Sequence, residues 1–167
     1  FRASYQRIFS NMEETAKVKS FRKKILPITN PNQKSKGVES LTDGIFGSYE
    51  SWQEADQNWV YYTGVHMDFI LDLGEVMPLN SVNMDFMNPQ AQPDWHLFAL
   101  PKFVTYSFSS DGNKYSEPLK ITNPNNPNPI ENPGISKISF FPFLAKLNAG
   151  TKARYIKVHA ESLLKTP

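Results

Sequence analysis

The residues that could do chemistry in this chain gather first in the stretch LTDGIFGSYESW, from Leu41 to Trp52. A hydrophobic residue leads into Thr-Asp-Gly, and a serine hydroxyl and aromatic rings follow closely. Carboxylate, hydroxyl and main-chain carbonyl oxygens are the ligands that hard cations prefer. The same residues also suit a tight turn, because Asp and Gly are frequent turn formers. The stretch therefore indicates either a loop or a small cation site.

Catalytic motifs do not occur in the sequence. It contains no G-x-S-x-G, no H-E-x-x-H, no P-loop and no dinucleotide fingerprint. Its three histidines, His66, His96 and His159, lie far apart in the chain and show no metal-ligand spacing. Cysteine is absent, which excludes disulfides and the usual structural zinc sites but leaves the cellular compartment open. We therefore expect a protein without catalytic activity of its own.

Length and composition indicate one globular domain. The chain has 167 residues, of which 40% are hydrophobic and 20% are charged, and these values suit a packed core. The net charge of +2 is too small to indicate a nucleic-acid partner. No apolar run approaches the roughly 20 residues of a membrane span, so we expect no membrane insertion.

The chain begins with a helical pattern and continues with strands. Apolar residues recur at helical spacing in the first segment, at Tyr5, Ile8, Phe9, Met12 and Ala16. Alternation of apolar and polar residues then predicts strands at Lys24–Thr29, His66–Leu73, Leu79–Met87, Lys102–Ser110, Ile135–Phe143 and Ala153–Glu161. An Asp-Gly pair after the fourth strand predicts a hairpin. Polar, Pro-rich and Gly-rich loops separate most strands, which favours an antiparallel sandwich or jelly roll.

The order of these motifs resembles the discoidin domain, which is also called the coagulation-factor C-type or galactose-binding-like domain and includes the family 32 carbohydrate-binding modules. The resemblance runs from about Val38 to Glu161. Its most specific parts are Asp72-Leu73-Gly74, the SSDG unit from Ser109 to Gly112, and the ARYI stretch that begins at Ala153.

The resemblance implies a jelly-roll β-sandwich of about eight antiparallel strands in residues 21–167. Residues 1–20, with the expected helix, lie outside it and are similar to the tail of an upstream domain. The chain opens on Phe1 rather than Met, and we interpret it as a piece of a longer protein.

Many members of the family hold a structural calcium ion. Transferred to this chain, the ligands would be the Asp43 carboxylate, the Leu41 carbonyl, the Ser48 hydroxyl, the Glu161 carboxylate and the carbonyl of Ala160. Calcium takes six to eight oxygen ligands, which a loop of this kind supplies. Sodium is the alternative ion. In the alternative without an ion, Asp43 caps a turn and Glu161 is a solvated strand end.

The resemblance also implies a sugar site in loops at one end of the sandwich. Such a site stacks an aromatic ring on the pyranose and binds its hydroxyls with polar groups. The candidate residues are Gln53, Glu54, Trp59, Tyr61, Asn88, Gln90, Asp94, Trp95 and His96. Galactose-binding members often carry an Arg where this chain has Gln90 or a neighbouring residue, and a His where it has Gln53, which argues against galactose specificity. Alternatively, Trp95 anchors its loop on the sheet, and Trp59 and Tyr61 cover the sandwich end.

Two functions follow as hypotheses. The first is a non-catalytic carbohydrate-binding module of a bacterial glycoside hydrolase, located in the periplasm or outside the cell, with glycan and an upstream catalytic domain as partners. The second is a structural or protein-interaction domain of the same fold, which packs against a catalytic neighbour and binds no sugar.

Overall fold

A computed structural model describes residues 18–33, 35–45, 59–88, 100–123 and 139–162 of the chain. This part is all-β: it holds nine strands and one short 3-10 helix, and it contains no α-helix. The all-β prediction is therefore confirmed. The expected helix at the start of the chain lies outside the described residues and stays a prediction. The described residues also include no helix long and apolar enough to cross a membrane.

The elements follow one another as nine strands with the helix η1 after the first. Their bounds are β1 (Lys24–Pro27), η1 (Val38–Thr42), β2 (Met67–Pro78), β3 (Ser81–Val82), β4 (Asp85–Asn88), β5 (Phe103–Ser109), β6 (Leu119–Thr122), β7 (Ser139–Pro142), β8 (Ala145–Lys146) and β9 (Lys152–Ala160).

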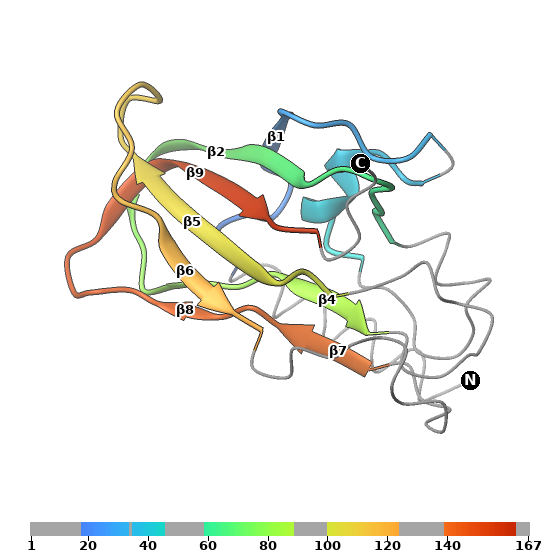
Figure 1. The fold of residues 1–167 in the computed structure, drawn as a ribbon. Coiled ribbons are helices and arrows are strands. Elements are labelled where there is room, and N and C mark those ends of the chain that lie inside the picture. Colours follow the sequence, from blue (N-terminus) through green and yellow to red (C-terminus); the bar gives the residue numbers. More distant parts are fainter. Residues whose placement is uncertain (1–17, 34, 46–58, 89–99, 124–138, 163–167) are drawn as a thin grey trace, which may run out of the picture.

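The strands form two layers. Five of them make one antiparallel sheet in the order β1-β2-β9-β5-β6. The antiparallel pairs β3-β8 and β4-β7 lie in the other layer, below this sheet in Figure 1. The expected antiparallel pairing is thus confirmed, and Pro27 lies in the edge strand β1, where a missing N–H is tolerated.

Alternation of side chains places the core between the layers. In β2, Met67, Phe69, Leu71 and Leu73 are buried, while the residues between them are partly exposed. β9 repeats the pattern from Ile156 to Ala160. Because successive side chains of a strand point to opposite faces, the residues that alternate with these lie on the outer face of the sheet.

One buried hydrogen bond joins the five-stranded sheet to the other layer. Tyr106, on β5, donates its hydroxyl to the main-chain carbonyl of Phe143 at 2.6 Å. Both residues are fully buried. The main-chain N–H of Phe143 donates in turn to the carbonyl of Met84. The tyrosine therefore fixes the spacing of the two layers as well as filling the core.

The predicted strand from Leu79 to Met87 is a single element only in its side-chain pattern. Val82, Met84 and Phe86 all pack against the core, as the alternation predicts. The backbone, however, changes partner: β3 pairs with β8 and β4 pairs with β7. The prediction of one strand is therefore wrong, because alternation reports which side chains face the core and not which strand accepts the hydrogen bonds.

Candidate functional site

Two strands bring four polar side chains together at one end of the outer face. β2 and β9 pair antiparallel, with Asp68 opposite His159 and Met67 opposite Ala160. One residue further along, the chain reaches His66 before β2 and Glu161 after β9. Met67 and Ala160 are buried, so their neighbours on both strands lie on the outer face.

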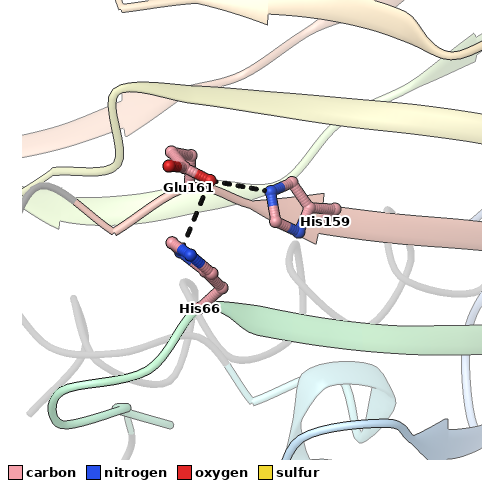
Figure 2. A group of neighbouring side chains, drawn as sticks. All are labelled: His66, His159 and Glu161. Atoms are coloured by element: carbon pink, nitrogen blue, oxygen red, sulfur yellow. Dashed lines mark hydrogen bonds and ion pairs between the residues drawn. The ribbon is translucent and has the colours of Figure 1, made fainter. Parts of the chain in front are cut away.

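His159 lies between two carboxylates. Its Nδ1 atom is 2.7 Å from Oδ1 of Asp68, and its Nε2 atom is 3.1 Å from Oε2 of Glu161. The same Glu161 oxygen lies 3.4 Å from Nδ1 of His66. Figure 2 shows the glutamate reaching both imidazole rings, whose centroids are 5.3 Å apart. The site thus combines two imidazoles with two carboxylates, and the Glu161 carboxylate contacts both rings.

The backbone around this cluster is fixed by hydrogen bonds. Glu161 donates its N–H to the carbonyl of Phe103 at 3.0 Å and accepts the N–H of Lys102 at 2.9 Å. The Thr29 hydroxyl donates to the carbonyl of His66 and accepts the N–H of Asp68. The glutamate is therefore held by the start of β5. The residues at the start of β2 are held by Thr29 and by the N–H of Ile28, which donates to the carbonyl of Asp68.

The cluster is shielded but not closed. The side chains of Asp68, His66, His159 and Glu161 are 19%, 22%, 27% and 27% exposed, respectively. Tyr62 lies close to Asp68. Burial of the Tyr62 hydroxyl, and to a smaller extent the negative charge of Asp68, raise the pKa of Tyr62 to about 12. A small ion can therefore reach the cluster from solvent, while neighbouring side chains limit its hydration.

The histidine spacing suggested no such cluster, and on this point the interpretation of the sequence was wrong. His66 immediately precedes β2 and His159 lies on β9, and the β2-β9 register sets them side by side. The alternation in each strand places its histidine on the outer face. The signal that was missing is the pairing of one strand with the other.

The expected calcium ligands are only partly described. Asp43 ends η1, and its Oδ1 atom accepts the N–H of Ile45 at 2.7 Å, which is a turn contact. Leu41 packs against the core, Ala160 is buried, and Ser48 lies outside the described residues. Glu161 directs an oxygen at two imidazole nitrogens. Calcium at this place therefore stays a prediction.

The expected sugar site lies mostly outside the described residues. Trp59 and Tyr61 are partly buried in the segment that leads into β2, and the Tyr61 backbone bonds to Asn32 and to the Ser35 hydroxyl. Asn88 is the last residue of β4. The other candidates have no described position: Gln53, Glu54, Gln90, Asp94, Trp95 and His96. Their roles stay predictions.

No protein-family profile matches the sequence, and no curated protein does. Solved structures, by contrast, share the fold. A fucose-binding module of Streptococcus pneumoniae matches with a TM-score of 0.56 and 11% identity over 86% of each chain. The C-terminal domain of a chitobiase from Bacteroides fragilis has a TM-score of 0.52 and 14% identity, over 88% of this chain and 86% of that one.

A third similar structure was solved with a sugar. CpGH89CBM32-4 of Clostridium perfringens, in complex with GlcNAc-α-1,4-galactose, matches with a TM-score of 0.51 and 10% identity, over 89% of this chain and 80% of that one. At such identities the likeness shows the fold, and function must be argued from the site. The resemblance to discoidin-like carbohydrate-binding modules is thereby confirmed at the level of fold.

Proposed function

We propose that this chain is a non-catalytic carbohydrate-binding module built on a jelly-roll β-sandwich. The observation that carries the proposal is the shared fold: the antiparallel two-layer architecture matches a fucose-binding module and a module solved with a disaccharide across more than four fifths of the chain. Because one fold serves many functions, the binding surface must carry the rest of the argument.

The ends of several described strands meet at one end of the sandwich. β4 ends at Asn88 and β5 begins at Phe103, so the segment that contains Trp95 connects these two points. β2 begins and β9 ends at the same end (Figure 1). The segment that holds Trp59 and Tyr61 leads into β2. We propose the sugar-binding surface at this end, because the described strands that border the candidate segments begin or end here.

The shape and polarity of a pyranose ring explain why both aromatic and polar side chains are candidates for the site. It has an apolar face of C–H groups, which stacks on an aromatic side chain, and a rim of hydroxyls that lose their hydration on binding. Tryptophan supplies the largest such surface, and Trp95 is flanked by Asp94 and His96, which can bind hydroxyls. Gln90 and Gln53 stand where galactose-binding relatives often carry Arg and His, so the sugar we propose is other than galactose.

The proposed module acts by holding the catalytic domain close to its glycan substrate. Tethered to a glycoside hydrolase in the periplasm or outside the cell, it raises the effective concentration of the glycan near the catalytic domain and performs no chemistry itself. Its partners in this proposal are a glycan and an upstream catalytic domain of the same protein.

A glycan array with the tag-free chain tests the proposal, followed by calorimetric titration of the best ligand. Trp95→Ala should weaken binding by about 30-fold or more, equal to about 2 kcal/mol, since buried aromatic anchors dominate such interfaces. Tyr155→Ala is the matched control, because Tyr155 pairs with Ser109 at the opposite end of β5. Circular dichroism must show that both variants fold. An array without any bound glycan contradicts the proposal and favours a protein-interaction domain.

A further inference from the structure

His159 faces more acceptors than a neutral imidazole can satisfy. An ionised carboxylate only accepts hydrogen bonds, so the 2.7 Å contact with Asp68 requires the proton on Nδ1 of His159. A neutral imidazole carries one N–H, so Nε2 then has a lone pair. That lone pair lies 3.1 Å from a Glu161 oxygen, which is also an acceptor. The contact becomes attractive when a proton, carried by Nε2 or by the Glu161 carboxyl, or a metal ion lies between the two atoms.

His66 repeats this arrangement on the other side of the glutamate. The main-chain N–H of Ser162 donates to Nδ1 of His66 at 3.0 Å, so this atom carries no proton. Yet Oε2 of Glu161 lies only 3.4 Å away. One oxygen therefore faces the lone pairs of two imidazoles. A single added proton would satisfy one of these contacts, whereas one metal ion satisfies all three groups at once.

The distances fit a tetrahedral metal ion. Zinc binds imidazole nitrogen at about 2.0–2.1 Å and carboxylate oxygen at about 2.0–2.2 Å, so neighbouring ligand atoms lie about 3.4 Å apart. The two contacts of Glu161 measure 3.1 and 3.4 Å. One ligand atom from each of the three residues lies within 4.8 Å of the others. The remaining distance, between the ligand nitrogens of His66 and His159, must therefore shorten by at most about 1.4 Å. Rotation of the two partly exposed imidazole rings provides this change.

Asp68 completes the arrangement as a positioning residue. Metal-binding histidines usually donate their other ring N–H to a carboxylate, which fixes the tautomer and aims the free nitrogen at the ion. Asp68 does this for His159, and the Thr29 hydroxyl holds the main chain of Asp68. At His66, coordination replaces the hydrogen bond from Ser162.

We infer that His66, His159 and Glu161 form a binding site for a divalent transition-metal ion of the zinc type, oriented by Asp68. Two nitrogens and one oxygen suit zinc rather than calcium or magnesium, which take oxygen ligands. Exposures of 22–27% leave the fourth position open to water or to a group from a ligand. The ion ties the start of β2 to the end of β9 and stabilises the native state. The ion site lies at the same end of the sandwich as the proposed sugar-binding surface, because β2 begins and β9 ends there.

Calorimetric titration of the metal-stripped, tag-free chain with zinc chloride tests the inference. We expect one zinc per chain, a higher melting temperature with zinc, and loss of this binding in His66→Gln, His159→Gln and Glu161→Gln. Asp68→Asn should weaken zinc binding by about 10- to 100-fold without removing a ligand. Glu117→Gln, at an exposed position in the loop before β6, is the matched control and should bind as the unchanged chain does.

Cobalt(II) provides a readout that does not depend on the variants folding. Bound at this site in the unchanged chain, it should show the strong visible absorption of a tetrahedral ion, and zinc should displace it. Failure of the unchanged chain to bind zinc overturns the inference. Equal zinc binding in the His66 and His159 variants also overturns it, because the ion then lies elsewhere.

Discussion

The hydrogen bond between the two layers makes a prediction whose size follows from the structure. Tyr106→Phe keeps the ring, so no cavity opens, and it removes only the hydroxyl that donates to Phe143 at 2.6 Å. The Phe143 carbonyl is then left buried without this donor. An unsatisfied buried acceptor costs about 1–3 kcal/mol, and the hydroxyl no longer has to be desolvated. We expect a net loss of about 1–2 kcal/mol.

For a domain of this length, each kcal/mol shifts the melting temperature by about 2–4 °C, so Tyr106→Phe should melt about 2–8 °C lower. Differential scanning calorimetry, supported by urea unfolding, measures the change. Tyr155→Phe is the matched control, because Tyr155 is only partly buried and lies near the turn after β5. If the Tyr106→Phe variant has the same melting temperature as the unchanged chain, the hydrogen bond does not stabilise the contact between the layers.

The remaining predictions concern charge and ions. The hydrogen bond from Arg154 lowers the pKa of Asp72, so the pair stabilises the fold above the ordinary pKa of 3.8 and this contribution is lost as the pH falls through the lowered value. Arg154→Gln should therefore raise the midpoint pH of acid unfolding, followed by circular dichroism, and an unchanged midpoint contradicts the assignment. Calcium, if bound as the family pattern implies, should raise the melting temperature in His159→Gln but not in Asp43→Asn, while zinc should do the reverse. Because both candidate sites use Glu161, identical responses of both variants to both ions would contradict the assignment of Asp43 to calcium and His159 to zinc.

The candidate metal centre shows why residue spacing alone was a poor guide. Metal-binding motifs that can be recognised in a sequence lie on one helix or one loop, where local geometry fixes the distance between the ligands. Here His66 precedes β2 and Glu161 follows β9, far apart in the chain. Each strand, with the residue next to its end, contributes one imidazole and one carboxylate. The family resemblance selected Glu161 as a ligand, but it assigned the residue to a different ion and different partners.

The sequence by itself determined the all-β class, most strand positions and the faces of the strands. The alternation from Met67 to Leu73 and from Ile156 to Ala160 is a local property, because each buried side chain must stand two residues from the next. Only the tertiary structure decided which strands pair. Register between β2 and β9 depends on contacts across most of the chain, and it set Asp68 opposite His159 and brought His66 to Glu161. The same non-local choice divided the Leu79–Met87 pattern between β8 and β7.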